Sequence, residues 1–492
     1  MPLEQNEKSP IRDYKYAEVQ NEDKELGHCD PKKNYSREYI TTIIATLGTI
    51  VCGIQFTWMG PILPQMLSGS FKIQITMAES VWVFNLLHVG GLIGSIVASM
   101  ITNHFGRKRT IVWTTIPFII SSIIRIYAET VLHYYIAQFI GGFSVGASFA
   151  VVSMYISEIS SPEIRGILST FIHFSVSVGI LFVFVLGACL PIITYYYVLA
   201  IFPIIQLIFT FYLPETPYFQ VMKQDYKGAE KTLRYIRKKS NVQDELNRLI
   251  EGYKEEVSEK DQTFLDLFRD RTNLKSIIII TVLTMAQQWT GATAIYGYSQ
   301  VIFVDGHSSI SAESCGILLA LMNFAVVFLL GAVIDRFGRR VLLMVSGIVT
   351  LIPLTMLGVY FYLQDFTDFK YIEHFRLVPL IGIVFFKFSY GVGLSGIPYV
   401  LSGELFPTTV KAYASSLNSI TMTAIGIVAN NMYEIAFKEY NYPGVFAMFF
   451  ILLVLAIIFI YFMVPETKGL TLEEIQVKLR KSNKNKIRKI SN

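Results

Sequence analysis

Charged residues are scarce in this chain. Asp, Glu, Lys and Arg make up 16% of its 492 residues, against about 25% in an ordinary soluble protein. Hydrophobic residues reach 52% and aromatic residues 14%. This composition excludes a disordered chain and a coiled coil, because both need many charged side chains, and it argues against a soluble multidomain enzyme.

Cysteine is also sparse, and it forms no motif. Cys29, Cys52, Cys189 and Cys315 are scattered, without any C-x-x-C pair. Two of them lie inside apolar runs, so we interpret them as packed, reduced thiols, and we exclude a secreted disulfide scaffold.

Motifs of the common enzymes are missing as well. The sequence has no P-loop, no cluster with metal-ligand spacing and no recognisable nucleophile with a base. The net charge of +5 is small for this length and does not indicate nucleic-acid binding. We therefore predict no enzymatic activity, no metal, no cofactor and no nucleic-acid partner.

The N-terminal tail, residues 1–38, contains no long apolar run. A secretory signal peptide needs an apolar core of about 7 to 15 residues near the N-terminus. We therefore expect no cleaved signal peptide, and we expect the first apolar helix to direct membrane insertion.

Long apolar runs are what the chain has in abundance. A membrane-spanning helix needs about 20 mainly apolar residues, and twelve runs meet this requirement. They lie near 40–61, 80–102, 110–128, 134–157, 167–190, 195–213, 276–303, 315–334, 341–363, 377–402, 412–435 and 443–464. We predict an all-α polytopic membrane protein with 12 transmembrane helices, in two six-helix bundles at 39–213 and 276–464.

Lys and Arg are distributed unevenly over the loops. Of the 42, 36 lie in the two tails, in the segment 214–275 or in the short loops on the same side. Cytoplasmic loops carry an excess of Lys and Arg, so we predict that the tails 1–38 and 465–492 and the segment 214–275 are cytoplasmic.

The segment 214–275 is polar but not of low complexity. Leu246, Leu249, Ile250 and Tyr253 follow the i, i+3, i+4, i+7 spacing of an amphipathic helix. We expect short helices on the cytoplasmic surface, and a flexible charged linker is the alternative.

Three short strings of the first half recur in the second half in the same order. They are Phe105-Gly106-Arg107-Lys108 with Phe337-Gly338-Arg339-Arg340, Glu158 and Arg165 with Glu404 and Lys411, and Pro214-Glu215-Thr216 with Pro465-Glu466-Thr467. The order indicates a duplicated six-helix unit. Two such bundles can rock about a central site, which is alternating access, so the repeat predicts a carrier rather than a receptor.

Charged residues of these strings share the cytoplasmic side. We expect several ion pairs to bridge the two bundles there, to close that side and to bias a two-state equilibrium. The alternative is that the charges only set the topology. The expected network consists of Arg107, Glu158, Arg165, Glu215, Asp335, Arg339, Glu404, Lys411 and Glu466.

Together the strings resemble the sugar porter family of the major facilitator superfamily. The resemblance covers about residues 38–475. Within this family the chain is similar in particular to insect facilitated trehalose and glucose transporters, for instance in Pro214-Glu215-Thr216-Pro217-Tyr218. The motifs that carry it are Ile140-x-Gly142-Phe143-x-x-Gly146, Tyr155-x-x-Glu158 with Arg165, Asp335-Arg336-Phe337-Gly338-Arg339-Arg340, Gln287-Gln288 with Gly291, and Pro465-Glu466-Thr467-Lys468-Gly469.

The resemblance implies a major facilitator fold and a set of substrate-binding residues. These are Gln287 and Gln288 of the seventh helix, Thr293 after them, Asn323, Tyr399 and His173. Amides offer a donor and an acceptor together and suit vicinal hydroxyls, and an aromatic face suits the C–H surface of a sugar ring. A hydrogen bond between helices is the alternative role of the two glutamines.

Several positions depart from the family pattern. Thr293 and Gly391 stand where an asparagine and a glutamate occur in several glucose carriers, and Gln138 stands where the fourth helix usually has an arginine. The eleventh-helix Asn-Trp pair falls on Met422-Thr423, and Asn103-His104 replace the first loop's Asp-Arg. These changes leave a disaccharide, a polyol or a non-sugar solute open.

The first apolar run contains no acidic residue. The resemblance places a proton-coupling Asp in this helix, and Gln55 occupies its neighbourhood. A neutral amide cannot cycle a proton, so we predict uniport, although His88 and His173 could titrate near neutral pH. Lys387, well inside the tenth run, could border the substrate path or snorkel along its stem.

These patterns favour facilitative transport of a sugar such as trehalose or a hexose across the plasma membrane. A major facilitator carrier for a non-sugar solute and a non-transporting sugar sensor are the alternatives. The partners we expect are the small-molecule sugar and the lipid bilayer, and one copy of the chain should suffice for function.

Overall fold

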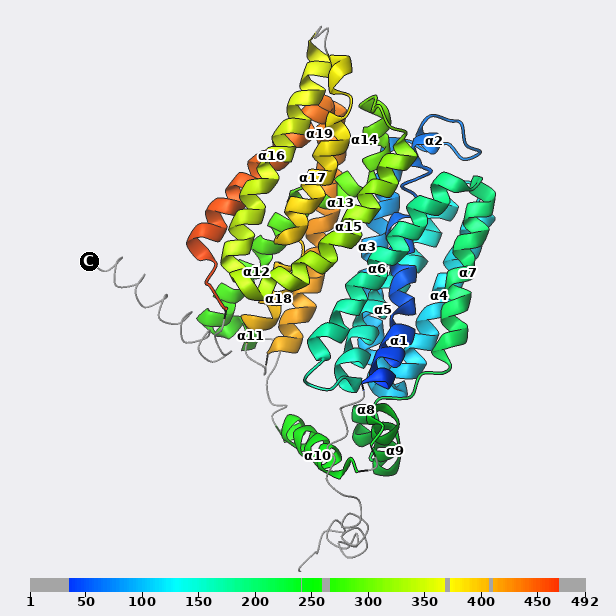
Figure 1. Ribbon diagram of the computed structural model, residues 1–492, viewed down its shortest axis with the longest axis vertical. Coiled ribbons are helices and arrows are strands. Elements are labelled where there is room, and N and C mark those ends of the chain that lie inside the picture. The colour runs from blue at the N-terminus through cyan, green and yellow to red at the C-terminus, as the bar shows by residue number, and fades with distance from the viewer. Residues whose placement is uncertain (1–34, 240, 259–265, 368–371, 407–409, 469–492) are drawn as a thin grey trace, which may run out of the picture.

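The computed structural model describes residues 35–239, 241–258, 266–367, 372–406 and 410–468, and nearly all of them are helical (Figure 1). In chain order the helices are α1 (Ser36–Thr57), α2 (Leu63–Leu67), α3 (Met77–Phe105), α4 (Arg107–Ile126), α5 (Val131–Ile159), α6 (Arg165–Cys189), α7 (Ile192–Thr210), α8 (Pro217–Met222), α9 (Tyr226–Arg237), α10 (Gln243–Ser258), α11 (Asp266–Arg269), α12 (Arg271–Trp289), α13 (Ala292–Gly297), α14 (Ser299–Asp305), α15 (Ala312–Phe337), α16 (Arg339–Phe366), the 3₁₀ helix η1 (Ile372–Phe375), α17 (Val378–Val392), α18 (Ile397–Glu404) and α19 (Lys411–Met463).

Ten helical stretches of the described chain are long and apolar enough to cross a membrane. The last of them, within α19, is two helices joined at Asn441, whose φ of 52° and ψ of −156° are not helical. A shorter apolar helix at Ala312–Val327 lies in α15. The kinked pair and this helix bring the set to the twelve predicted spans, and the chain is a multi-pass membrane protein.

The membrane helices form two groups that follow the chain order. In the first group α3 packs on α5, α4 on α5 and α7, and α1 on α6 and α5. In the second, α16 packs on α17 and α19, and α12 on α19. The groups meet where α6 contacts α15, α3 contacts α19 and α2 contacts α14 (Figure 1). We call the groups the N-terminal half and the C-terminal half.

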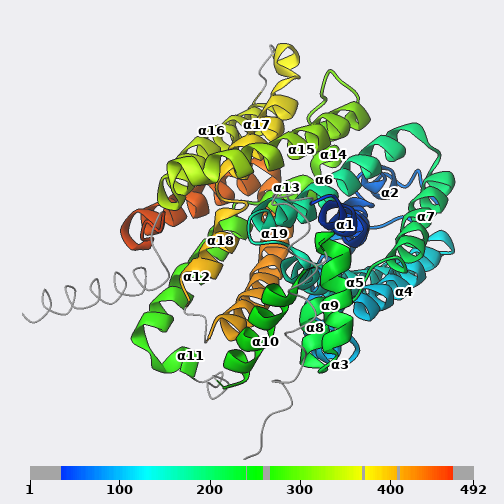
Figure 2. The same cartoon turned by 60° about the horizontal axis from the view of Figure 1, so that its bottom comes forward.

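The short amphipathic helices α8, α9 and α10 lie below the two halves in Figure 1 and in front of them in Figure 2. We call this end of the molecule the basic end. Val221, Ala229, Leu233 and Leu246 from α8, α9 and α10 form a small apolar core of their own. This unit is tied to the N-terminal half through Glu38, whose buried carboxylate lies 3.0 Å from Arg237 Nη1.

The seventh and tenth spans are broken, although the sequence predicts them as continuous apolar runs. Gly291 has a φ of 79° between α12 and α13, and a Cβ on it would lie 2.1 Å from Cε2 of Phe449. In the tenth span Gly393 and Gly396 separate α17 from α18. The breaks expose backbone carbonyls inside the molecule, where side chains or a solute can bind them.

Candidate functional site

The two predicted glutamines lie at the end of α12, directly before its break, and both are 5% exposed. Gln287 Nε2 donates to the carbonyl oxygen of Ser395 at 2.6 Å, inside the break of the tenth span. Gln288 Oε1 accepts a hydrogen bond of 3.0 Å from the Thr293 hydroxyl. Gln287 therefore joins the two broken spans, whereas the Gln288 amide nitrogen makes no hydrogen bond within the described chain.

Gln288 faces the N-terminal half. A Cβ built on Gly426 of α19 would lie 3.9 Å from Gln288 Oε1 and 3.8 Å from His88 Nε2 of α3. Gln288 and His88 therefore converge on one point between the halves. The sequence indicates only that His88 could titrate near neutral pH. Nothing in the sequence places His88 beside Gln288.

Asn323 also lies between the halves. Its Nδ2 donates to the Ser177 hydroxyl of α6 at 3.1 Å. Phe324, the residue after Asn323, packs against Phe174 of α6, and the centroids of the two rings are 5.1 Å apart. His173 lies on α6 one turn before Ser177, and its side chain is exposed and makes no contact with Asn323 that the structure describes.

Tyr399 lies on α18, 43% exposed, so its ring is accessible. Its hydroxyl donates to Met422 Sδ at 3.2 Å and also interacts with the Gln287 side chain. At Gly391 a Cβ would lie 2.2 Å from Cγ1 of Val326, so no larger side chain fits there without movement. The structure thus brings the glutamines, Thr293 and Tyr399 together, with Asn323 and His173 on the facing contact of α6 with α15.

An arginine that no sequence motif predicts as a site residue lies in the centre of the N-terminal half. Arg125 of α4 is 4% exposed. Its Nη2 donates to Gln55 Oε1 at 2.9 Å, and its Cζ lies 5.1 Å from the ring centroid of Trp58. Gln138 Oε1 accepts a 2.7 Å hydrogen bond from Trp58 Nε1 and a 3.4 Å one from Gln55 Nε2.

This arginine places a cation beside Gln55, which stands near the proton-coupling position, and beside Gln138, one of the positions that depart from the family pattern. No carboxylate of the described chain pairs with Arg125, and its Nη1 has no hydrogen-bond partner. A guanidinium stays protonated in proteins, so the group is a fixed charge held by amide, hydroxyl and aromatic partners. The signal in the sequence is a lone Arg inside an apolar run, but its partners Gln55 and Trp58 are 70 and 67 residues away.

At the basic end the three repeated strings of the first half meet in one cluster, the N-terminal clamp (Arg107, Glu158, Glu215 and Thr216). Arg107 Nε and Nη2 donate to Glu158 Oε1 at 3.0 and 2.8 Å. Glu215 Oε1 accepts from the backbone N–H of Arg107 at 3.0 Å. Gly106, with a φ of 97°, allows this approach, because a Cβ there would lie 2.3 Å from Glu215 Oε2.

The second half repeats this arrangement as the C-terminal clamp (Arg339, Glu404, Glu466 and Thr467). Arg339 Nη2 lies 3.2 Å from Glu404 Oε1, and Glu466 Oε1 accepts from the Arg339 backbone N–H at 3.0 Å. Burial works against the charge of Glu466, but backbone N–H donors from Arg339, Arg340, Thr467 and Lys468 outweigh it and hold its pKa below the usual range. This carboxylate stays ionised at neutral pH, and its contribution is lost only as the pH falls through that lowered pKa.

The described ion pairs of the predicted network each join residues of one half. Arg165 is exposed and has no partner within the described chain. The side chains of Asp335 and Lys411 lie outside the described residues. The bridging of the two halves at this end therefore stays a prediction for another conformation.

Polar contacts between the halves lie toward the opposite end, away from α8–α10. Ser80 Oγ and the Tyr298 hydroxyl are 2.9 Å apart, and Asn430 Nδ2 donates to Asn85 Oδ1 at 3.0 Å. The Phe84 and Tyr298 rings pack edge to face with centroids 5.4 Å apart. All of these side chains are buried, so the molecule is closed at the opposite end.

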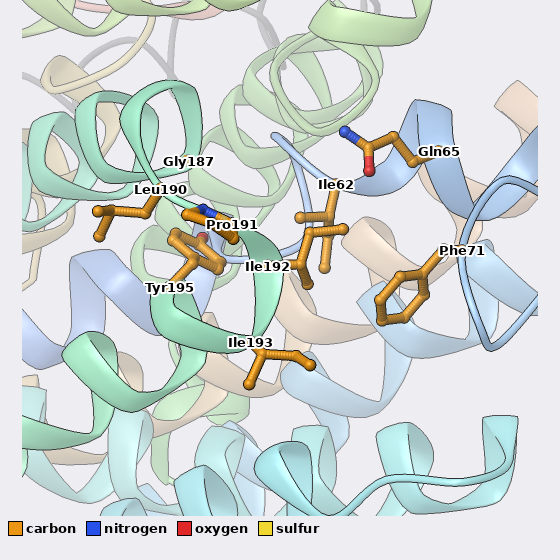
Figure 3. Close-up of a pocket in the computed structure, with 9 residues that line it drawn as sticks. All are labelled: Ile62, Gln65, Phe71, Gly187, Leu190, Pro191, Ile192, Ile193 and Tyr195. Carbon is orange, nitrogen blue, oxygen red and sulfur yellow. The ribbon is translucent and has the colours of Figure 1, made fainter.

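A cavity of about 420 Å³ lies apart from these residues, between the α1–α2 connection and the junction of α6 with α7 (Figure 3). Its lining is mostly apolar and includes Ile62, Pro191 and Ile192 around Gln65. It contains none of the predicted binding residues, and we assign it no part in the site.

Comparison with known proteins decides the family. The family model described as "Sugar (and other) transporter" matches residues 19–479. The chain belongs to the sugar transporter family. Proteins named "Facilitated trehalose transporter Tret1" are among the relatives of this transporter. The one from Culex quinquefasciatus is 30% identical over 90% of this chain and 86% of its own length, and the one from Polypedilum vanderplanki is 29% identical over 90% and 88%.

Solved structures confirm the major facilitator fold of this transporter. The inward open conformation of the xylose transporter XylE from E. coli matches with a TM-score of 0.72 and 20% identity, over 89% of this chain and 99% of that one. The proton:xylose symporter XylE bound to 6-bromo-6-deoxy-D-glucose matches with a TM-score of 0.69 and 20% identity, over 91% and 100%. The transporter is therefore not an enzyme by family or fold.

Proposed function

We propose that this protein carries a sugar such as trehalose or a hexose by facilitative uniport across the plasma membrane, with both tails and α8–α10 in the cytoplasm. The observation that carries the proposal is the cluster of amide and hydroxyl side chains around Gln288. This cluster lies between two matched halves. Facilitated trehalose transporters among the relatives support the choice of substrate class.

Alternating access follows from where the halves touch. In this topology the closed end faces outward, and the halves are held together there by the buried contacts of Ser80 with Tyr298 and of Asn85 with Asn430. Each clamp makes one half rigid at the cytoplasmic end. Rocking of one rigid half on the other would separate the outer contacts and bring the cytoplasmic ends together.

Uniport is supported by the polar core of the N-terminal half. Gln55 and Gln138 are neutral, and Arg125 is a permanently charged neighbour without a described acidic partner. This polar core cannot gain or lose a proton near neutral pH, so it cannot itself couple sugar movement to a proton gradient. Proton flux that accompanies sugar uptake would contradict this point.

The experiment that tests the function is uptake of labelled trehalose, glucose and fructose into proteoliposomes that contain a trapped pH dye. Saturable uptake that dissipates the sugar gradient without a change in internal pH supports a sugar uniporter. Uptake of none of the sugars favours a carrier for another solute. Saturable sugar binding without flux favours a sensor.

The role of Gln288 leads to a testable prediction. Gln288→Ala should raise the KM for the transported sugar by about two- to tenfold, because one hydrogen bond contributes about 0.5–1.5 kcal/mol. Gln287→Ala should in addition lower stability, since Gln287 also bonds Ser395. Initial uptake rates and thermal unfolding measure the two effects. Gln65→Ala, at an exposed position of α2, is the control. A KM for Gln288→Ala equal to that of the control would remove Gln288 from the site.

The hydrogen bond between Asn85 and Asn430, at the outer end of the molecule, leads to a second testable prediction. Asn430→Leu removes the hydrogen bond between the halves, so the outward-open population should rise about two- to tenfold. The readout is the rate at which a membrane-impermeant maleimide labels Ser80→Cys in a protein without other cysteines. Asn431→Leu is the matched control, because Asn431 bonds only within its own helix, to Ile427. Equal labelling in the two variants would show that the Asn pair does not hold the closed state.

A further inference from the structure

Lys387 is a cation inside the C-terminal half that has no described acidic partner. It lies on α17, and its Nζ is 4.6 Å from the ring centroid of Tyr296. Within the described chain it makes no hydrogen bond and no ion pair. The side chain points to α13 rather than along its own helix toward an interface, so it does not snorkel. A charged side chain in this position borders a partner or a water-filled path.

Two buried hydrogen-bond donors of the seventh span lack partners within the described chain, and one of them is the hydroxyl of the ring that Lys387 faces. The Tyr296 hydroxyl and Gln300 Nε2 are buried and make no hydrogen bond with the described residues, and Gln300 is only 2% exposed. Tyr296 lies near the end of α13 and Gln300 near the start of α14, with Tyr298 between the two helices. A buried donor without a partner is costly, so these groups indicate that something else binds them.

These donors lie at the contact between the halves. The Tyr296 ring packs edge to face on Phe184 of α6, with centroids 6.0 Å apart. A Cβ built on Gly316 would lie 2.6 Å from Phe184 Cδ1 and 2.8 Å from Gln300 Nε2. Phe184 therefore covers both Tyr296 and Gln300 from the opposite half. When the halves separate at their outer end, this cover is removed and the donors face the entry path.

The chemistry of the group selects the ligand. A neutral sugar hydroxyl needs donors and acceptors in balance, but this group combines an ammonium with a hydroxyl and an amide N–H that lack acceptors. Gly391, one turn beyond Lys387, supplies no carboxylate, and Val326 fills the space that a side chain there would need. The missing partner is an anionic acceptor, and a carboxylate matches it in charge and in hydrogen-bond capacity.

We propose that Lys387, Tyr296 and Gln300 form a subsite that binds the carboxylate of an acidic sugar, such as a hexuronate. The proposal rests on the proposed function, because the sugar ring would occupy the region of Gln288. It extends the substrate class from neutral sugars to sugar acids. The Lys387 ammonium also offsets the cost of moving the anion out of water.

The test compares uptake of labelled glucuronate and glucose into proteoliposomes whose membrane potential is clamped at zero. The wild-type protein should take up both in a saturable way. Lys387→Met keeps the apolar stem and removes the charge, and it should lower the ratio of kcat/KM for glucuronate to that for glucose by about tenfold or more. Lys387→Arg keeps the charge and should retain most of the ratio.

A matched control separates the local charge from the net charge. Lys438 is exposed on α19, and Lys438→Met removes one positive charge there without changing the ratio. Size-exclusion chromatography shows that each variant is folded. Uptake of glucose but not glucuronate by the wild type, or an unchanged ratio in Lys387→Met, overturns the subsite alone. If neither sugar shows saturable uptake, the proposed function and the subsite are both overturned. Uptake of glucuronate alone supports the subsite and excludes the neutral sugar as a substrate.

Discussion

Arg107→Ala should lower the free energy of unfolding by about 3–5 kcal/mol, the cost of breaking a buried ion pair on one side. The side chains of Arg107 and Glu158 are 3% and 12% exposed. Cζ of Arg107 also lies 5.5 and 5.4 Å from the rings of Tyr218 and Phe219. Without the arginine, the Glu158 carboxylate remains buried and, among the described residues, keeps only its Thr216 partner. Titration of the purified protein with a denaturing detergent measures the loss.

The repeated clamp provides an internal comparison. In the C-terminal half Arg339 and Glu404 are 15% and 23% exposed and 3.2 Å apart, so Arg339→Ala should cost less, about 1–3 kcal/mol. Arg109 is an exposed residue two positions after Arg107, and Arg109→Ala should change stability by less than about 0.5 kcal/mol. Equal losses for Arg107→Ala and Arg109→Ala would show that the clamp adds no stability.

Gln55→Glu should make the stability of the folded protein dependent on pH. The substitution keeps the shape of the side chain and places a carboxylate oxygen at the position now 2.9 Å from Arg125 Nη2. The guanidinium is already buried without an acidic partner, so the ionised carboxylate gains a charge-assisted hydrogen bond of about 1.5–3 kcal/mol. This gain is present at neutral pH and is lost on acidification, when the carboxylate takes up a proton.

Thermal unfolding in detergent between pH 3 and pH 7 measures this change, because a glutamate held in its ionised form loses its contribution only as the pH falls below the ordinary pKa of about 4.3. The Gln55→Glu variant should become more stable relative to the wild type as the pH rises. Gln55→Met is the matched control, because it cannot ionise and its difference from the wild type should not vary with pH. A Gln55→Glu variant that parallels Gln55→Met at every pH would mean that Arg125 is not a fixed charge facing this position.

Hydropathy alone located the membrane helices, because a span of about 20 apolar residues is a local property of the chain. The run predicted at 134–157 corresponds to α5 (Val131–Ile159), and the run at 341–363 to α16 (Arg339–Phe366). The breaks at Gly291 and after Gly393 were not predicted. An isolated glycine in an apolar run is compatible with a continuous helix, and Phe449 and Ser395, which occupy or bind the breaks, lie more than 100 residues from Gly291 and Gln287.

The candidate site shows the same division. Gln287 and Gln288 were found from their adjacent amides, but their different roles depend on Ser395 and Thr293. Arg125 was visible as a stray charge, and its contact with Gln55 was not, since 70 residues separate the two. The repeated strings predicted a charge network, and only the structure shows that Arg107 with Glu158 and Arg339 with Glu404 each tie one half together.

The amino-acid sequence by itself determined the membrane class, the duplicated halves and the family, because apolar run length, loop charge and short motifs are read along the chain. The tertiary structure decided which end is closed, which glutamine has an amide nitrogen without a described partner, and where the cations Arg125 and Lys387 lie without an acidic partner among the described residues. These features depend on contacts between helices that are distant in the chain, and a residue's partner across a helix interface is set by packing and not by its neighbours in sequence.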